Sequence, residues 1–326
     1  MQELNELQRN FINLFQGGFP LTERPFSNIA ALLGTTEATL ILLIQQLLDD
    51  RIISRFGPFF NADRMGGAFT LAAMQVPESR FEEVAKLVNS MHAVAHNYQR
   101  EHALNMWFVI AADRPSGITD CIAGIEQATS IHVFNFPKLQ EFYLGLKLHL
   151  QDDGKVDTVA MQFPELQEPH PLDDLDKQII GATQAGLPLE PHPYTAVARQ
   201  IHSDTGEVIM RMQRMLDSGM IRRIGAAPNH YHLGLKANGM TVWNVADDQL
   251  QEIGQQMGAL DYVSHCYERP RHLPHWPYNL FAMIHGTDRE QVYSKLDKMK
   301  QAFPHQQVDV LFSSAILKKT GMRIAA

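Results

Sequence analysis

The sequence predicts an α+β protein built by tandem duplication, in which each half is a winged helix-turn-helix followed by a ferredoxin-like α/β sandwich. Three observations lead to this fold class: a repeat at a constant offset, a helical pattern at the start of each copy, and an alternating pattern in the rest of each copy. With 326 residues, of which 45% are hydrophobic, the chain can bury the cores of several domains.

The repeat is visible in motifs that recur 168 residues apart, which is the distance from Phe19 to Leu187. The other matched motifs include Pro25-Phe26 with Pro193-Tyr194, Arg55-Phe56-Gly57 with Arg223-Ile224-Gly225, and Asn61 with Asn229. Solenoid repeats are only about 20 to 50 residues long, so this period indicates a duplicated domain pair.

The first part of each copy has the pattern of a winged helix-turn-helix. In copy one, a helix ends near Gly34, and a following helix carries Leu40 and Ile44 on one face before a short apolar strand. Copy two repeats this order of elements. The predicted winged helix-turn-helix domains are residues 1–62 and 172–232.

The second part of each copy changes from a helical to an alternating pattern. Its order is strand, helix, strand, strand, helix, strand, which is that of a ferredoxin-like sandwich. The last predicted strands are short, at 133–136 and 308–312. The predicted ferredoxin-like domains are residues 63–150 and 233–326, with a proline-rich linker at 151–171.

Composition limits the function classes. The net charge of −8 repels phosphate backbones, so nucleic acid is not an expected partner. The two cysteines, Cys121 and Cys266, are too few for a disulfide framework. No signal peptide and no apolar stretch of membrane-spanning length are expected, and these features together favour a cytoplasmic protein with no membrane partner.

A winged helix-turn-helix before a ferredoxin-like domain resembles the Lrp/AsnC transcription regulators, and this resemblance implies DNA binding. The recognition helix of copy one argues against it, because residues 35–50 contain no Lys or Arg. Copy two has Arg211 and Arg214, but Glu207 and Asp217 flank them. We interpret both helix-turn-helix units as structural and predict no specific DNA binding.

A row of His, Tyr and Arg at alternate positions occurs once in each copy. Alternate residues of a strand face one side, and each row spans about 13 Å, enough to line a large planar ligand. In a ferredoxin-like fold the helices cover only one sheet face, so the rows meet solvent, a ligand or a partner sheet. A solvated face is the simpler alternative. As surface-facing strand residues, the two arginines are expected to contribute little to core packing and more to ligand binding. The rows are His96, Tyr98 and Arg100, and His265, Tyr267 and Arg269.

Seven of the 15 histidines fall in two short segments around these rows. A zinc site is the rival interpretation, but the chain has no HExxH motif, and His230-x-His232 alone is a weak signal. We interpret His92 and His285 as ordinary strand-end or core histidines.

Copy two has an insertion after its row. Arg269 and Asn279 lie ten residues apart, whereas Arg100 and Asn105 lie five apart, and three prolines stiffen the longer segment. The loop presents His272, His275 and Trp276. It is predicted to form a pocket wall beside the row, and an elaborate hairpin loop is the alternative.

These segments closely resemble the sirohaem decarboxylases, which are Lrp/AsnC-like proteins made of two related subunits or a fused chain. The resemblance covers the whole chain. The segments that carry it are His96-Asn97-Tyr98-Gln99-Arg100-Glu101-His102, Asn105-Met106-Trp107-Phe108, Arg222-Arg223-Ile224-Gly225-Ala226, His265-Cys266-Tyr267-Glu268-Arg269-Pro270 and Trp276-Pro277-Tyr278-Asn279-Leu280-Phe281.

The resemblance implies that the substrate is sirohaem, a tetrapyrrole with eight carboxylates, and that two acetate side chains lose CO2 to give 12,18-didecarboxysirohaem in haem d1 or alternative haem biosynthesis. It implies that iron arrives with the substrate, and no added cofactor or protein metal site is expected. The expected catalytic residues are His96, Tyr98, His102, His265 and Tyr267. The expected substrate-binding residues are Arg100, Asn105, Trp107, Arg223, Arg269, His272, His275, Trp276 and Asn279.

Two other functions stay open from the sequence: a ligand-responsive regulator and a tetrapyrrole carrier without catalysis. The halves are expected to pack as an internal pseudo-dimer with a pocket lined by both and with unequal roles. Further oligomerisation and contacts with other haem d1 biosynthesis proteins are compatible with this arrangement.

Overall fold

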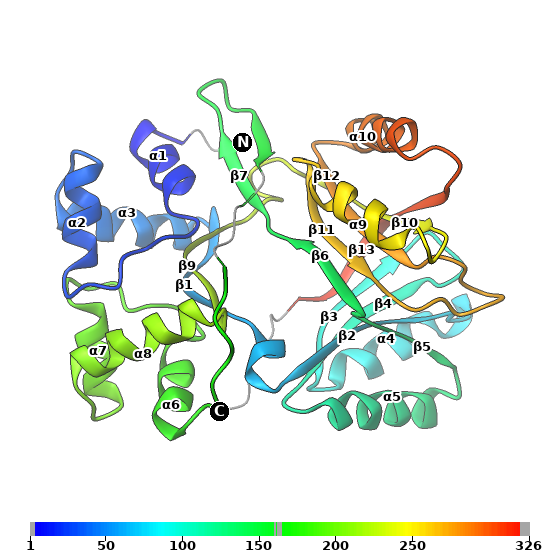
Figure 1. The fold of residues 1–326 in the computed structure, drawn as a ribbon, viewed down its shortest axis with the longest axis horizontal. Helices are drawn as coiled ribbons and strands as arrows, with labels where there is room; N and C mark the ends of the chain where they lie inside the picture. The colour runs from blue at the N-terminus through cyan, green and yellow to red at the C-terminus, as the bar shows by residue number, and fades with distance from the viewer. Residues whose placement is uncertain (1–3, 160, 162–164, 320–326) are drawn as a thin grey trace.

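The computed structural model describes residues 4–159, 161 and 165–319. The winged helices form one body, and a large sheet with its own helices forms the other (Figure 1). The predicted fold class and the duplication are both confirmed. The outermost predicted bounds, at residues 1 and 326, lie outside the described residues.

Each copy begins with three helices and a strand. Matching capping boxes start the first helix of each copy, because the Asn5 and Asp173 side chains accept from the backbone N–H groups of Gln8 and Asp176. These elements are α1 (Glu6–Leu14), α2 (Pro25–Leu32), α3 (Glu37–Asp49) and β1 (Ile53–Phe60) in copy one, and α6 (Asp174–Thr183), α7 (Pro193–Gln200), α8 (Thr205–Asp217) and β9 (Ile221–Pro228) in copy two.

The two wing strands join the winged helices to each other. β1 and β9 pair antiparallel with Gly57 opposite Gly225, and buried side chains of both copies form one continuous core. A Cβ at Gly225 would lie 2.4 Å from the Phe15 carbonyl oxygen, and one at Gly57 would lie 2.7 Å from the Leu187 nitrogen. Only glycine allows each wing to pack this closely against the first helix or loop of the other copy.

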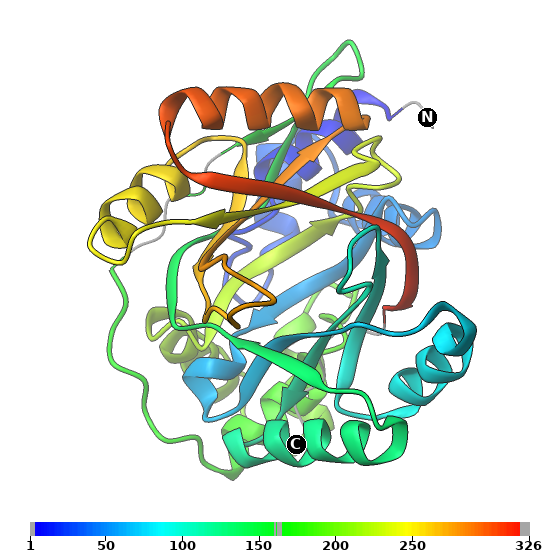
Figure 2. The same cartoon turned by 90° about the vertical axis from the view of Figure 1, so that its right-hand side faces the viewer.

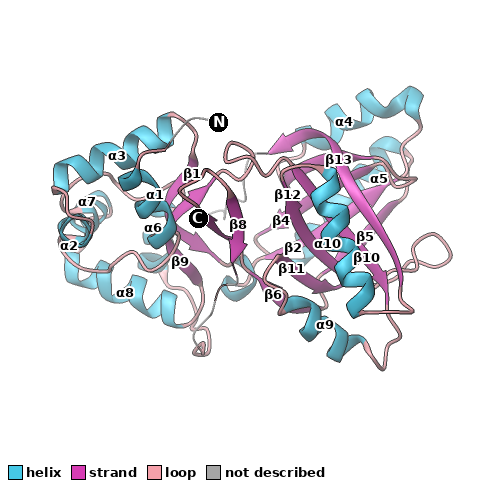
Figure 3. Cartoon of the chain, turned by 90° about the horizontal axis from the view of Figure 1, so that it is seen from above, coloured by secondary structure: helices cyan, strands magenta, loops and turns pink. Residues whose placement is uncertain are grey.

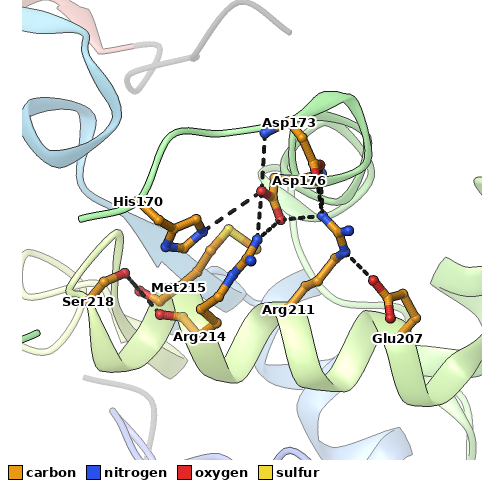
Figure 4. A network of polar contacts seen from close by, with 8 residues as sticks. All are labelled: His170, Asp173, Asp176, Glu207, Arg211, Arg214, Met215 and Ser218. Atoms are coloured by element: carbon orange, nitrogen blue, oxygen red, sulfur yellow. Dashed lines mark hydrogen bonds and ion pairs between the residues drawn. The ribbon is translucent and has the colours of Figure 1, made fainter. Parts of the chain in front are cut away.

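The arginines of the second recognition helix are held in ion pairs within the domain (Figure 4). Arg211 on α8 contacts Asp173 at 2.6 Å, Asp176 at 3.1 Å and Glu207 at 2.5 Å. Arg214 contacts the buried Asp176 at 3.0 Å. The cations that made this helix resemble a DNA reader are therefore neutralised by neighbouring carboxylates.

The second part of each copy has the predicted order of strands and helices. Copy one forms β2 (Ala68–Met74), α4 (Phe81–Ser90), β3 (Val94–Arg100), β4 (Met106–Ala112), α5 (Pro115–Thr129) and β5 (Val133–Pro137). Copy two forms β10 (Ala237–Asn244), α9 (Leu250–Gly258), β11 (Val263–Glu268), β12 (Leu280–Gly286), α10 (Arg289–Ala302) and β13 (Gln307–Lys319). Short 3-10 turns occur at Ala62–Met65 and Glu78–Arg80.

The two ferredoxin-like units share one nine-stranded sheet in the order β5-β2-β4-β3-β13-β10-β12-β11-β6. The strands curve around a common interior, with α9 and α10 outside one side and α4 and α5 outside the other (Figures 2 and 3). Aromatic and aliphatic side chains from both units fill this interior, including Trp107, Phe136, Trp276 and Phe281.

Each copy gives its last strand to the other copy. β13 continues past the predicted end at residue 312 and pairs with β3, and β6 (Gln140–Leu144), which the sequence did not predict, pairs with β11. In copy one the equivalent strand is interrupted after Pro137, which lacks the N–H that a central strand needs. The predicted internal pseudo-dimer is confirmed, and its exchanged strands border both His-Tyr-Arg rows.

The predicted linker contains regular structure. A hairpin forms between β7 (Lys147–Leu150) and β8 (Val156–Val159), and β8 lies inside the segment predicted as linker. Gln16 holds β7 by accepting from the Leu148 N–H and donating to its carbonyl, and Leu148 is buried in the core of the winged helices. The prediction of 151–171 as an unstructured linker is therefore wrong at β8, which pairs with β7 just before this segment.

No single helix in the described chain is long and apolar enough to cross a membrane, and only α2 and α3 together, bent by 95° relative to each other, reach that length and composition.

Candidate active site

The two His-Tyr-Arg rows face the interior of the shared sheet. Between the row positions, Asn97 points the other way and bonds to Asn89 on α4 at 3.0 Å, and the Cys266 thiol approaches the Gly254 carbonyl on α9 at 3.6 Å. Strand alternation therefore directs the row residues away from the helices. Both rows line the space between the copies, as the sequence predicted for a face that meets a partner.

Arg100 and Arg269 are buried at the inner end of their rows, only 8% and 5% exposed. Arg100 donates to the Leu311 carbonyl of copy two at 2.8 Å, and Arg269 donates to the Phe136 carbonyl of copy one. Burial lowers the pKa of each guanidinium to about 10. The prediction that these arginines contribute little to packing is wrong, because the exchanged strands cover the face that was expected to be open.

Neither arginine has a charge partner among the described residues. The Nε atoms of Arg100 and Arg269 are buried without a hydrogen-bond partner, and neither side chain forms an ion pair with a described carboxylate. A buried cation without an anion costs several kcal/mol, on the order of the desolvation penalty per ion. Two such groups on the same interior indicate a site for an anionic ligand.

A chain of hydrogen bonds anchors the histidine of the second row. His265 Nδ1 lies 2.7 Å from Ser264 Oγ, which lies 2.6 Å from His285 Nε2. His285 Nδ1 lies 2.5 Å from the Asn238 side-chain oxygen. Burial lowers the pKa of His265 to about 4 and that of His285 well below its usual value, so both imidazoles are neutral near pH 7.

The first row meets residues that follow the second wing strand. The rings of Tyr98 and His96 are stacked with centroids 6.2 Å apart. Burial lowers the pKa values of His96 and His230, and the charge of Lys319 lowers both further. The pKa of His230 falls to about 4. Lys319 also lies 5.0 Å from the Tyr231 ring centroid.

His230 links the surroundings of the two rows. Its ring lies 4.3 Å from that of Tyr231 and 5.5 Å from that of His285 between centroids, and the charges of Lys319 and His265 both contribute to its lowered pKa. Among the described residues, no group of three or more His, Cys, Asp or Glu side chains is arranged to hold a metal ion. The cluster is therefore a set of neutral imidazoles, tyrosines and cations.

A cavity of about 870 Å³ opens between the winged helices and the shared sheet, and none of the six row residues lines it. Residues from both copies line it, among them Asn61, Glu141, Arg222 and Arg223. Glu141 and Arg222 also shift the pKa of His265, although burial is the larger effect. Its volume is typical of a site for a cofactor-sized ligand. Both halves line it, as predicted, but it lies apart from the rows on which that prediction was based.

The second row is bordered by an ion cluster formed by Asp63, Lys138, Glu141 and Arg222. Lys138 contacts Asp63 at 2.6 Å and Glu141 at 2.8 Å, and Arg222 contacts Glu141 at 3.4 Å. Lys138 also lies 5.8 Å from the Tyr267 ring centroid. Two cations and two anions compensate one another on this side.

Among the residues that the structure describes, the first row has no such cluster. The residues equivalent to Asp63, Glu141 and Arg222 are Tyr231, Ile316 and Ser54, which carry no charge at neutral pH. Arg100 and Lys319 are therefore cations without a described carboxylate partner on this side. The charge of the two rows differs, which supports the expected inequality of the copies.

Comparison with known proteins shows which family has this organisation. A family model described as the "Siroheme decarboxylase NirDL-like HTH domain" matches residues 8–53 and 176–222, and one described as the "AsnC-like ligand binding domain" matches 64–143 and 232–318. The "Siroheme decarboxylase NirDL subunit" of Paracoccus denitrificans is 32% identical over 331 residues, covering 99% of this chain and 98% of the relative.

The chain belongs to the siroheme (sirohaem) decarboxylase family. The "Siroheme decarboxylase NirG subunit" of Stutzerimonas stutzeri is 51% identical over 44% of this chain and 97% of its own length. The crystal structure of a siroheme decarboxylase NirDL in complex with an iron-uroporphyrin III analogue has a TM-score of 0.72 and 26% identity, and covers 97% of this chain and 93% of that chain. This sirohaem decarboxylase family member thus has relatives that are fused like itself and relatives of half its length.

The tryptophans expected to contact substrate in this family member are core residues. Trp107 and Trp276 are 0% exposed, with ring centroids 5.1 Å apart, and both pack on Phe136. Trp107 Nε1 donates to the Leu104 carbonyl at 2.7 Å. Both rings pack in the interior, and a substrate contact for either of them stays a prediction.

Asn105 and Asn279 are also structural. Asn105 accepts from the Val76 N–H and donates to the Val76 carbonyl, and Asn279 makes the same pair of bonds with Val245. Each amide closes a loop by replacing a missing strand partner. Their recurrence in both copies reflects this shared backbone role, and the amides are occupied without a substrate.

The remaining predicted histidines lie at the far ends of the rows. His102 packs on Trp276 with ring centroids 5.4 Å apart and accepts from the Leu104 N–H, and His272 Nε2 contacts the Asn135 carbonyl at 2.8 Å. His275 is exposed beside Phe134. The proline-rich loop follows the second row at Arg269 and covers the aromatic interior with Trp276 and Tyr278. Its role as a pocket wall beside the row stays a prediction.

Arg223 lies at the cavity but is held by backbone oxygens. It donates to the Gln16 and Ala226 carbonyls, and its guanidinium stacks on Phe59 at 3.9 Å from the ring centroid. Burial, followed by the charge of Arg55, lowers its pKa to about 10. It lines the cavity, and a substrate contact for it stays a prediction.

The sequence interpretation missed part of the site. It treated His285 as an ordinary core histidine and His230 as a weak metal signal, and it did not select Ser264, Tyr231 or Lys319. A comparison of the copies could have pointed to Tyr231. It replaces Asp63 between two matched positions, Asn61 with Asn229 and Gly66 with Gly234. The long β13 that brings Lys319 to the first row was not readable from the local pattern.

The buried neutral histidines predict a loss of stability in mild acid. Because the pKa values of His230 and His265 are about 4 in the folded protein and 6.5 ordinarily, the unfolded chain binds more protons between these values. Stability should therefore be present above pH 6.5 and lost as the pH falls toward 4, by roughly 2 kcal/mol per group at pH 5. Urea unfolding at pH 7.5 and 5.0 measures the loss.

The matched variants for this measurement are His230→Gln and His92→Gln. The first removes a buried imidazole and should reduce the loss between the two pH values, whereas the second alters an exposed imidazole and should leave the loss unchanged. An equal acid sensitivity of wild type and His230→Gln would contradict the assignment.

Proposed function

We propose that this protein is a carboxy-lyase that removes CO2 from two acetate side chains of sirohaem, a step in haem d1 biosynthesis. The observation that carries the proposal is the pair of buried arginines, Arg100 and Arg269, which have no described charge partner and lie in an interior lined by both copies. Family membership supplies the substrate class, since the full-length relatives are named siroheme decarboxylases.

The interior suits the binding of a polycarboxylate. Guanidinium groups form charge-assisted hydrogen bonds to carboxylates, and such bonds are stronger where water is excluded. Lys319 supplies a further cation, and the cavity lined by Glu141 and Arg222 gives room for part of a macrocycle. In this proposal Arg100, Arg269 and Lys319 bind carboxylates of the substrate, and the tyrosines of the two rows orient it.

The histidines are suited to move protons when substrate binds. Each decarboxylation breaks the bond between the methylene and carboxyl carbons, leaves the electron pair on the methylene carbon, and consumes one proton to form the methyl group. Bound carboxylates raise the pKa of nearby imidazoles, whereas loss of a carboxylate as CO2 lowers it again. His96 and His265 therefore gain a proton as substrate enters and release it as CO2 leaves.

The test is anaerobic incubation of the purified protein with sirohaem, without added metal or organic cofactor, followed by mass spectrometry of the tetrapyrrole. We expect successive loss of two CO2 molecules. Binding of sirohaem without any change in its mass would identify a carrier instead. Activity that appears only after a cofactor is added would contradict the proposal that the chain needs none.

The helix-turn-helix units should not bind DNA specifically. Arg211 and Arg214 are neutralised by acidic neighbours, and the α3 helix has no Lys or Arg. An affinity that depends on phosphate contacts needs free cations. A mobility-shift assay at low salt should show no discrete complex, and a footprint that survives physiological salt would favour the regulator alternative.

A further inference from the structure

Two neighbouring residues of β11 reach the interior together because the strand contains a bulge. The register shifts between Val263 and His265, so the side chain of Ser264 lies on the same side as His265 and contacts it at 2.7 Å. Bulges of this kind redirect a side chain next to functional sites. The bulge therefore places a hydroxyl directly behind the imidazole of the second row.

The other end of the hydrogen-bond chain fixes the direction of the protons. The side-chain oxygen of Asn238 faces His285 Nδ1 at 2.5 Å. A side-chain hydrogen bond with Asn238 also lowers the pKa of Tyr231, against the larger and opposite effect of burial. A carbonyl oxygen only accepts, so His285 carries its proton on Nδ1.

The remaining bonds follow from the number of protons available. Neutral His285 has a lone pair on Nε2 and accepts the Ser264 hydroxyl proton at 2.6 Å, a shorter contact than the 3.4 Å from that hydroxyl to the Met283 carbonyl. The serine oxygen then has only lone pairs left for His265, whose Nδ1 must donate. The Nε2 atom of His265 is left without a proton.

We propose that Ser264, His285 and Asn238 are positioning residues that hold His265 in its Nδ1–H tautomer and keep a bare Nε2 for the substrate. The inference rests on the proposed function for its catalytic consequence. A bare Nε2 can accept a proton or bind iron, whereas an Nε2–H can do neither. The residues that supply this control are Ser264, His285 and Asn238, none of which the sequence interpretation selected.

Copy one provides an internal comparison. The same bulge occurs before His96, but Ala95 stands in place of Ser264, and the pair Phe69 and Ala111 occupies the register of Asn238 and His285. His96 Nδ1 is buried without a described hydrogen-bond partner. The structure thus fixes the tautomer of one row histidine and leaves the other free to respond to ligand.

The tautomer can be read directly by long-range proton–nitrogen NMR on the full chain labelled with ¹⁵N-histidine. The His265 signal is identified by its loss in His265→Gln. At pH 7.5 we expect wild type to carry the proton on Nδ1, and Ser264→Ala, which recreates copy one, to show the Nε2–H form. Ser264→Thr keeps the hydroxyl and should keep the wild-type tautomer.

The kinetic expectation is a fall in kcat for CO2 release of about 10-fold to 100-fold in Ser264→Ala, with little change in KM, as for loss of other groups that orient a functional histidine. Thr241→Ala is the matched control, because it removes another buried hydroxyl that bonds to the Ala282 carbonyl and Trp243. It should lower stability while leaving the His265 tautomer and kcat unchanged.

An Nε2–H proton on His265 in wild type, or a wild-type tautomer and kcat in Ser264→Ala, would overturn the inference. The NMR result does not depend on turnover. If wild type fails to decarboxylate sirohaem, the proposed function fails, and the tautomer in wild type and Ser264→Ala still decides whether the positioning network exists.

Discussion

Replacing Arg100 with methionine should weaken sirohaem binding by about 1.5 to 3 kcal/mol, or about 10-fold to 150-fold in Kd, because a charge-assisted carboxylate contact is lost. The same change should leave the free energy of unfolding unchanged or raise it, by up to about 4 kcal/mol, because methionine fills a similar volume without a buried charge. Arg269→Met should behave in the same way. Absorbance titration and urea unfolding measure the two effects.

The opposite signs of these effects make the prediction specific. If an arginine served only the fold, its substitution would lower the free energy of unfolding of the protein. The sirohaem affinity of the folded fraction would then stay unchanged. Arg289→Met is a suitable control, because Arg289 is exposed outside the interior. It forms an ion pair with Glu101 at 2.8 Å. It should alter neither quantity by more than about 1 kcal/mol. Wild-type sirohaem affinity in both Arg100→Met and Arg269→Met would show that the arginines are not the carboxylate anchors.

His265→Ala should reduce kcat by about 100-fold to 10,000-fold, the usual contribution of a positioned acid or base. His96→Ala should act mainly on affinity or on the second decarboxylation, so that a product lacking one CO2 accumulates. The reason is that Ser264 anchors His265, whereas His96 Nδ1 has no described partner. Time courses followed by mass spectrometry separate the two outcomes.

The control for this pair is His275→Ala. The sequence placed His275 in the site, whereas the structure places it exposed beside Phe134. Its substitution should leave both decarboxylations unchanged. Equal loss of activity in His96→Ala and His265→Ala, with the same intermediate in both, would remove the support for unequal roles.

Much of the site could be predicted because the chain is duplicated. The rows His96-x-Tyr98-x-Arg100 and His265-x-Tyr267-x-Arg269 survive in both copies, and strand alternation is enough to place their members on one face. The same local periodicity predicted the order of helices and strands in each half. The recurrence of Asn105 as Asn279 was equally visible, but it reflects two identical loop closures, since a repeated polar residue can serve the backbone as well as a ligand.

The sequence by itself determined the duplication, the fold class, the family and the two polar rows, because these depend on residue spacing within each copy. Only the tertiary structure decided that Arg100 and Arg269 are buried, that Lys319 lies opposite His96, that His230 lies beside His285, and that Ser264 anchors His265. These features depend on exchanged strands and on a bulge that reverses side-chain direction. Pairing between distant strands is set by how the two halves pack, which no local pattern records.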